Sequence, residues 1–223
     1  MMRLVMPLVN SPAVDLDIEE WINGTTTNIS NELGRPILIK VFQTNCPGCF
    51  THGIPEILEI IKKFSDTPLL VWGLATAFED FHLNNLDNLK KLIGSGEVVG
   101  ETYAVLNREG LLNDNNKLEY SIPFPIAWDK VIPYKPSDYV VASQQIIDKD
   151  FPQFNSFPVK NQKLITKQVI DYLKLKKFEA KTFETYELKG TPSTLLIDKN
   201  GILRGKWFGS GYGLEKEVEK IIV

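Results

Sequence analysis

The only two cysteines of this 223-residue chain lie where an apolar run gives way to a helical pattern. Segment 36–42 is apolar at nearly every position, which is typical of a strand buried on both faces of an α/β sheet. The tetrapeptide Cys46-Pro-Gly-Cys49 follows closely, and from Phe50 the apolar residues recur with the spacing of an amphipathic helix. Segment 68–74 predicts a second buried strand. The order strand, helix, strand indicates a βαβ unit with parallel strands.

Apolar periodicity also predicts the elements that follow. They are, in order, helices over 84–93 and 102–112, a strand over 124–128, a helix over 164–178, strands over 194–197 and 202–208 joined by a tight turn at 199–201, and a helix from 214 on. Pro55 falls inside the first helix and predicts a kink there. In helix 164–178 we expect Tyr172 and Leu173 to face inward and the lysines to face outward.

The composition restricts the class of protein. Hydrophobic residues make up 43% of the chain and charged residues 24%, which is typical of a globular protein and not of a disordered one. The formal net charge of −3 argues against a nucleic-acid binder and gives no support for binding to an anionic membrane. Pro7 and Pro12 break the N-terminal apolar run, and no window has the length of a membrane span. The N-terminal segment does not fit a signal peptide, and we therefore expect a cytoplasmic protein.

The cysteine pair has the spacing and the setting of a redox site. Two cysteines are too few for a disulfide framework or for a zinc site of four cysteines. At the start of a helix, unpaired backbone N–H groups and the helix dipole stabilise a thiolate, so the pKa of Cys46 should be low. Cys49 lies one turn further along and can attack a mixed disulfide formed at Cys46. Pro47 suits a first helical turn. These features predict thiol–disulfide exchange, with Cys46 attacking and Cys49 resolving.

A second motif, Thr191-Pro192, precedes the apolar strand 194–197. A proline cannot donate to a strand ladder, and at a strand entry it is often cis. Together with Phe42-Gln-Thr-Asn-Cys-Pro-Gly-Cys49 and the segment 190–201, this motif resembles the thioredoxin-like superfamily. The resemblance is closest to the TlpA-like and alkyl-hydroperoxide-reductase-like (AhpC/TSA) redoxins.

The resemblance covers about residues 14–128 and 186–222 and has structural consequences. It implies an α/β thioredoxin-like fold with a central mixed sheet flanked by helices. In such a fold Pro192 is cis and faces the cysteine pair. The backbone of Thr191 then hydrogen-bonds an extended segment of the partner protein, so Thr191 and Pro192 are the expected substrate-binding residues.

Two positions depart from the family pattern. Asn45 replaces the usual tryptophan, and Lys40 stands where thioredoxins carry a buried aspartate that helps ionise the second cysteine. Some TlpA-like proteins use an acid on the helix instead, and the nearest match here is His52, with Glu56 one turn further. His52 follows Cys49 by three residues on the same helix face, and histidine side chains in general can transfer protons near neutrality. We predict that His52 mediates proton transfer at the thiols; the alternative is an exposed histidine without a role.

The cysteine pair is compatible with three other roles. Peroxiredoxins place a threonine three residues before the attacking cysteine, whereas Gln43 holds that position here and Thr44 comes one residue late. A peroxiredoxin-like thiol peroxidase using Cys46 is therefore the nearer alternative. The cysteine pair could also bind or deliver a metal with His52 and His82, which gives the ligand number that zinc prefers. Buried structural cysteines are the third alternative.

The length exceeds what a minimal version of this fold needs. We expect one domain over 1–223, with its core at 14–128 and 186–222, interrupted by an insertion of unknown role over 130–187. Segment 130–162 fits no regular element and is rich in proline and aromatic residues; long segments of this kind are often functional. The hypothesis is that the insertion determines partner choice. The glycine-rich segment 209–213 is interpreted as a flexible turn, because it lacks the lysine of a phosphate loop.

The sequence thus predicts a thiol–disulfide oxidoreductase that acts on protein thiols or disulfides through the Cys46/Cys49 couple. A protein substrate or a protein electron donor is the expected partner. No cofactor, nucleic acid or membrane is expected to take part. The Pro-Gly dipeptide influences the direction of the reaction but does not reveal it.

Overall fold

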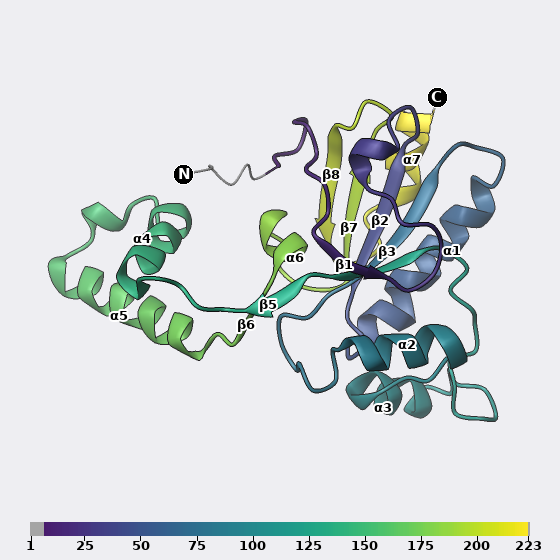
Figure 1. Cartoon of the computed structure of the whole chain (residues 1–223), viewed down its shortest axis with the longest axis horizontal. Helices are drawn as coiled ribbons and strands as arrows, with labels where there is room; N and C mark the ends of the chain where they lie inside the picture. Colours follow the sequence, from purple (N-terminus) through teal and green to yellow (C-terminus); the bar gives the residue numbers. More distant parts are fainter. Residues whose placement is uncertain (1–6, 223) are drawn as a thin grey trace. The chain divides into compact units, whose positions relative to one another are not determined.

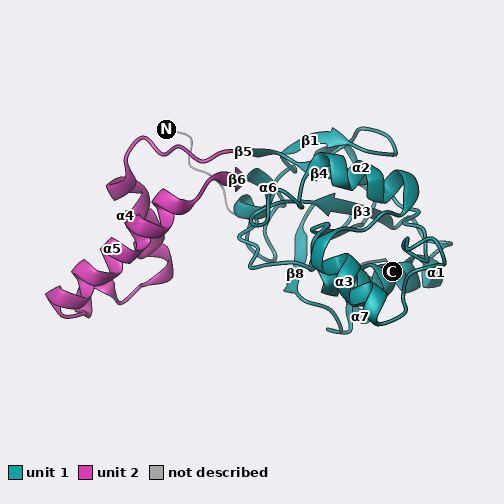
Figure 2. Cartoon of the chain, turned by 90° about the horizontal axis from the view of Figure 1, so that it is seen from below, with its two compact units in different colours: residues 1–131, 180–223 teal, residues 132–179 magenta. Residues whose placement is uncertain are grey.

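The computed structural model describes residues 7–222, which form two compact units (Figures 1 and 2). The larger unit extends to Val131 and resumes at Ala180, and the smaller unit is Ile132–Glu179. The first six residues lie outside the described range, and the prediction that the N-terminal segment does not fit a signal peptide partly rests on them. None of the helices within residues 7–222 combines the length and the apolar character that crossing a bilayer requires.

A six-stranded mixed sheet forms the centre of the larger unit, in the order β1-β4-β3-β2-β7-β8. The pairs β2–β3 and β3–β4 are parallel, and the other pairs are antiparallel. The strands are β1 (Ile18–Trp21), β2 (Ile37–Phe42), β3 (Leu70–Ala75), β4 (Ile126–Asp129), β7 (Ser193–Ile197) and β8 (Leu203–Phe208). The parallel β2–β3 pair confirms the predicted βαβ unit.

Helices and helical turns connect these strands (Figure 1). They are the 3₁₀ turn η1 (Ile29–Asn31), the π-helical turn η2 (Cys49–Gly53), α1 (Ile54–Lys63), α2 (Leu86–Ser95), α3 (Gly100–Arg108), α6 (Lys181–Thr185) and α7 (Leu214–Ile222). The long predicted helix after Phe50 is therefore divided into η2 and α1.

The two faces of the sheet bury separate apolar clusters. Alternation along β2 sends Leu38 and Phe42 to one face and Ile37, Ile39 and Val41 to the other. The first cluster is completed by buried residues of α1, α2, α3 and α7, and the second by η1 and the segment from 180 to 188. All six residues of β2 are buried, as the continuous apolar run predicts. The end of β2 is thus held firmly from both sides.

Pro55 does not kink the interior of a helix. It stands in the first turn of α1, where its missing N–H costs little. The preceding turn has π geometry, because the Ile54 N–H bonds the carbonyl of Cys49 five residues back. The helix therefore has a wider π turn directly at Cys49 and regular α geometry from Ile54 on. The apolar periodicity of the sequence does not reveal this π turn.

The smaller unit is helical, contrary to the absence of regular elements predicted for 130–162. It contains α4 (Tyr139–Asp150), the 3₁₀ turn η3 (Phe154–Ser156) and α5 (Val159–Leu175), and the strands β5 (Val131–Pro133) and β6 (Phe178–Ala180) pair where the chain leaves and re-enters the larger unit. Helix α5 begins five residues before the predicted start at 164. Leu173 is buried as predicted, but Tyr172 is 60% exposed, so the prediction that it faces inward is wrong.

Candidate active site

Strand β2 and turn η2 together determine where the two thiols lie. Cys46 follows the end of β2, and Pro47 and Gly48 open the helical turn that contains Cys49. The Cys49 N–H bonds the Cys46 carbonyl at 2.9 Å, which closes the turn between them. Cys46 is half-buried, whereas Cys49 is fully buried beneath it. Only Cys46 is therefore presented to another molecule.

The surroundings of the two thiols shift their acidities in opposite directions. A hydrogen bond from the Cys49 thiol, helped by the Thr191 side chain and the Cys49 backbone N–H, lowers the pKa of Cys46 to about 7, against the effect of burial. Burial is the main cause that raises the pKa of Cys49 well above its usual value. The low pKa predicted for Cys46 from the helix start thus arises chiefly from the neighbouring thiol.

Pro192 packs against the turn that carries Cys49. The Thr191–Pro192 peptide bond is cis, as the resemblance implied. A Cβ placed on Gly53 would lie 2.9 Å from Pro192 Cβ, and one on Gly48 would lie 3.9 Å from Pro192 Cδ, so the proline ring covers both ends of the turn. The Cys46 thiol donates to the Thr191 carbonyl at 3.4 Å. The structure thus brings Cys46, Thr191 and Pro192 together.

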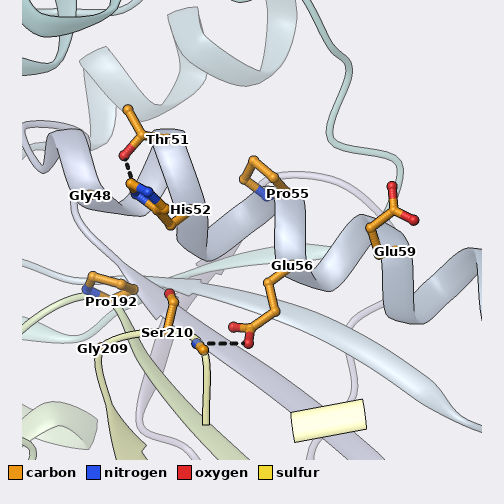
Figure 3. Close-up of a pocket in the computed structure, with 10 residues that line it drawn as sticks. Gly48, Thr51, His52, Pro55, Glu56, Glu59, Pro192, Gly209 and Ser210 are labelled. Carbon is orange, nitrogen blue, oxygen red and sulfur yellow. Dashed lines mark hydrogen bonds between the residues drawn. The ribbon is translucent and has the colours of Figure 1, made fainter. Parts of the chain in front are cut away.

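A cavity of about 620 Å³ opens beside Pro192 (Figure 3). Its lining comes from the cysteine turn, from α1 and from the loop after β8. The lining residues are Gly48, Thr51, His52, Pro55, Glu56, Glu59, Pro192, Gly209, Ser210 and Gly211. The cavity therefore adjoins the cysteine turn.

His52 lies on this cavity and not on a thiol. Its side chain is exposed, and its Nδ1 is 2.7 Å from the Thr51 hydroxyl. That hydroxyl also donates to the Pro47 carbonyl at 3.1 Å, which ties the imidazole to the turn. Cys49 is fully buried whereas His52 is exposed, so the two side chains differ in their access to solvent.

Lys40 is fully buried, at 0% exposure, in the middle of β2. Its ammonium group lies 3.3 Å from Glu56 Oε2 and donates to Thr194 Oγ1 at 2.9 Å. Burial, the largest influence, lowers the pKa of Lys40, while Glu56 and the two thiolates raise it. The position that carries an aspartate in thioredoxins therefore holds a cation with its own carboxylate.

Asn45 stands at the position of the tryptophan that is usual in the family. Its hydrogen bonds connect three segments of the chain. Its N–H donates to Asn84 Oδ1 at 2.8 Å, and its side-chain amide donates to Asp80 Oδ2 at 2.9 Å. The same side chain accepts from the Glu101 N–H, at the start of α3, at 2.7 Å. These bonds hold the loop before Cys46 against the loop after β3.

The two alternative functions find little support in this geometry. Within residues 7–222, no group of three or more histidine, cysteine, aspartate or glutamate side chains is arranged to hold a metal ion. His82 is exposed on the loop after β3. The Thr44 hydroxyl donates to the Leu83 carbonyl at 2.9 Å, whereas the Cys46 thiol donates to the Thr191 carbonyl.

Sequence reasoning missed the residues that join the cavity to the core. The Gly211 N–H donates to Glu56 Oε1 at 3.0 Å, so the glycine-rich segment interpreted as a flexible turn is fixed to α1. Gly53 fits under Pro192 only because it lacks a side chain. Lys40 is a charged residue inside an apolar strand pattern, which indicates that it needs a buried partner. The strand pattern does not indicate that this partner is Glu56.

Comparison with known proteins identifies the fold. No protein-family model and no curated protein matches the chain. A solved structure of a thioredoxin-like superfamily protein is 25% identical in sequence and has a TM-score of 0.57. The match covers 95% of this chain and 96% of the chain of that protein. A thiol-disulfide isomerase from Corynebacterium glutamicum is 22% identical, with coverage of 96% and 97% and a TM-score of 0.56.

A third structure, the thioredoxin domain of a thiol-disulfide oxidoreductase from Bacteroides vulgatus, is 14% identical, covers 97% of this chain and 99% of its own, and has a TM-score of 0.50. The mixed six-stranded sheet of the larger unit, covered by helices on both faces, agrees with this fold. The larger unit therefore has a thioredoxin-like fold, and the chain carries an insertion before its cis-proline loop.

Proposed function

We propose that the protein is a thiol–disulfide oxidoreductase acting on protein thiols or disulfides, with Cys46 as the nucleophile and Cys49 as the resolving thiol. The observation that carries the proposal is a half-buried Cys46, whose pKa is lowered to about 7, directly beside cis-Pro192 and above a fully buried second thiol. A thiol with a pKa near ambient pH combines a large thiolate fraction with high nucleophilicity. The names of the similar structures agree with this function.

The reaction proceeds through two exchanges. The Cys46 thiolate attacks one sulfur of a partner disulfide, a bond forms between the two sulfurs, and the partner's second sulfur leaves as a thiolate and takes up a proton. The Cys49 thiolate then attacks the Cys46 sulfur and releases the partner's first sulfur. The partner gains two electrons and two protons, and the protein is left with a Cys46–Cys49 disulfide. Partner thiols are oxidised by the reverse sequence.

Thr191 and Pro192 would bind the partner. The Thr191 carbonyl accepts from the Cys46 thiol at 3.4 Å. When Cys46 loses its proton or joins a mixed disulfide, that bond is lost and the carbonyl can accept an N–H from an extended partner segment. The adjacent cavity offers the surface along which such a segment would lie.

His52 would mediate proton transfer across the cavity, between solvent and the sulfurs released during exchange. Its exposure and its place on the cavity support this role, and the Thr51 hydroxyl orients the ring. Replacing His52 with Ala and measuring alkylation of Cys46 and Cys49 against pH tests it. The proposal expects an altered profile, and unchanged profiles for both thiols would refute it.

Reduction of insulin by dithiothreitol, followed as turbidity, tests the oxidoreductase activity. The wild-type chain should accelerate precipitation, and Cys46→Ser should abolish the acceleration because no nucleophile remains. Cys49→Ser should instead accumulate a mixed disulfide at Cys46 that mass spectrometry detects. Equal rates for the wild-type and Cys46→Ser proteins would refute the proposal. Consumption of hydrogen peroxide by the same samples separates it from a peroxidase.

A further inference from the structure

The ammonium group of Lys40 is buried beneath the cysteine turn. The side chain leaves β2 on the same face as Leu38 and Phe42, toward the cluster that contains Cys49, and it is 0% exposed. Burying an unpaired charge is strongly unfavourable. The position therefore requires a specific set of partners.

Those partners connect Lys40 to the cavity. Glu56 Oε2 lies 3.3 Å from the ammonium group, and the Thr194 hydroxyl on β7 accepts from it at 2.9 Å. The second oxygen of Glu56 accepts from the Gly211 N–H at 3.0 Å, and the Glu56 side chain is 21% exposed. The carboxylate thus bridges a buried cation and the loop after β8. Figure 3 shows Glu56 and its hydrogen bond to that loop from the cavity side.

The same ammonium group lies next to the redox turn. A Cβ on Gly53 would approach Lys40 Cε to 3.4 Å, and Gly53 ends the π turn that Cys49 begins. Three titratable groups raise the pKa of Lys40. They are Glu56 on α1 and the two thiols, Cys49 and Cys46, which precede α1 in the chain. Strand β7 contributes only the neutral Thr194 hydroxyl.

Stability does not account for such a pair. Replacing a buried ion pair by apolar residues of similar volume is often neutral or stabilising. Cys49, however, must lose a proton inside an apolar core, where burial holds its pKa well above the usual value. A cation in the same core is the group that makes the thiolate easier to form.

We propose that Lys40 is the counter-charge of the Cys49 thiolate and that Glu56 limits its strength. In the resting dithiol state the charges of Lys40 and Glu56 cancel, so the Lys40–Glu56 pair has no net charge. When Cys49 releases its proton to water, Lys40 stabilises the new thiolate until it attacks the Cys46 sulfur and expels the partner's sulfur, which takes up a proton. Lys40 is a positioning residue in this scheme, and its place in the reaction rests on the oxidoreductase function proposed above.

The ionisation of Cys49 can be measured alone in the full-length Cys46→Ser protein, where it is the only cysteine. Its protonation is followed by the chemical shift of the isotope-labelled Cys49 β-carbon against pH. Adding Lys40→Met should raise the Cys49 pKa, with a roughly tenfold smaller acid dissociation constant, because the cation is lost. Adding Glu56→Gln should lower the Cys49 pKa, because the cation is no longer offset.

Lys63→Met is the matched control, since Lys63 lies at the exposed end of α1 and pairs with Glu215. It should leave the Cys49 titration unchanged. Opposite shifts from Lys40→Met and Glu56→Gln distinguish electrostatic control from a merely structural role. No shift in either variant, or shifts in the same direction, would overturn the inference. If Lys40→Met does not fold, the direction of the Glu56→Gln shift decides.

A second readout uses turnover. With both cysteines present, Lys40→Met should prolong the lifetime of the mixed disulfide at Cys46, because the resolving thiolate forms less readily. Failure of the two proposals is distinguishable. Insulin reduction by the wild-type chain without any change in Cys49 titration would refute the role of Lys40 alone. Shifted titrations in a chain that does not reduce insulin would refute the oxidoreductase function alone.

Discussion

The two thiols of this chain differ because one is at the surface of the turn and the other is inside it. The hydrogen bond from Cys49 is the largest cause of the low Cys46 pKa. We therefore predict that Cys49→Ser changes the pKa of Cys46 less than Cys49→Ala, because a serine hydroxyl can still donate. Alkylation of Cys46 against pH by mass spectrometry measures both values. The same pKa in the two variants would show that the bond does not control it.

Asp129 is a buried carboxyl that joins two distant parts of the chain. It accepts from Thr76 Oγ1 at 2.7 Å and from the N–H groups of Thr182 and Phe183, at the start of α6, at 2.9 and 3.1 Å. Burial raises its pKa from 3.8 to about 6, and these hydrogen bonds oppose the rise. The folded protein therefore holds this proton more tightly than the unfolded chain does.

The raised pKa has a defined consequence for stability. The contribution of Asp129 to the free energy of unfolding is fully present below pH 3.8 and is lost as the pH rises through about 6. Asp129→Asn cannot titrate, so the stability of the wild type relative to this variant should fall across that window. Urea denaturation at several pH values measures the difference. A constant difference between the two proteins would contradict the raised pKa.

At the scale of elements, η2 depends on a glycine. A Cβ on Gly53 would come within 2.9 Å of Pro192 Cβ. Gly53→Ala should therefore push the turn and the proline loop apart, destabilise the fold by about 1–3 kcal/mol, and slow insulin reduction. Gly94→Ala in α2, where nothing lies within 4 Å, is the matched control.

The control substitution should have the opposite sign. Alanine at an open helical site stabilises by about 0.5–1 kcal/mol relative to glycine, so Gly94→Ala should raise the free energy of unfolding and leave turnover unchanged. Thermal unfolding and turbidity assays compare the two variants. If Gly53→Ala is as stable and active as Gly94→Ala, the close contact with Pro192 does not constrain the turn.

Elements with a strong apolar pattern were predictable from the sequence, and others were not. Strand β2 is buried at every position, so its apolar run was decisive. Helix α4 escaped prediction because Val140 and Val141 are exposed while Ser143 and Ile147 are buried, so its apolar residues do not form one stripe. The first turn of α6 is held by the carboxylate of Asp129, which lies 53 residues from Thr182 in the sequence. No local sequence pattern reveals this contact.

The candidate site divides in the same way. The cysteine pair and the Thr191–Pro192 motif are local signals, and the structure brings them together. The Lys40–Glu56 pair depends on how α1 packs on β2, so the sequence showed an unusual lysine without its partner. For His52, the helical spacing ignored the π turn, which leaves the ring exposed on the cavity.

At the scale of the molecule, the insertion forms a unit of its own. Helices α4 and α5 expose a set of large apolar side chains: Val140, Val141, Val159, Leu164, Tyr172 and Leu175. A cavity of about 540 Å³ on this unit is lined by Lys163, Lys167 and Lys174 among others. Exposed apolar side chains of this kind are the reason for proposing that the insertion has a role in partner choice.

Excising the insertion tests this role. The Tyr134 N–H donates to the Lys177 carbonyl at 2.9 Å, so the two chain segments are close enough for a two-residue Asn-Gly turn to replace residues 135–176. The shortened chain should fold and reduce insulin at about the wild-type rate. With Cys49→Ser added, it should trap fewer protein partners than the full-length Cys49→Ser chain. Identical sets of trapped partners would contradict a role in partner choice.

The central claim is that Cys46 and Cys49 form one reversible redox couple. The most direct test equilibrates the full-length protein with mixtures of reduced and oxidised glutathione, alkylates the free thiols and analyses the products by mass spectrometry. We predict a single two-electron transition between the dithiol and an intramolecular Cys46–Cys49 disulfide, and its midpoint gives the reduction potential and hence the favoured direction. Stable glutathione adducts on Cys46, or two thiols that stay reduced across the whole range, would contradict the claim.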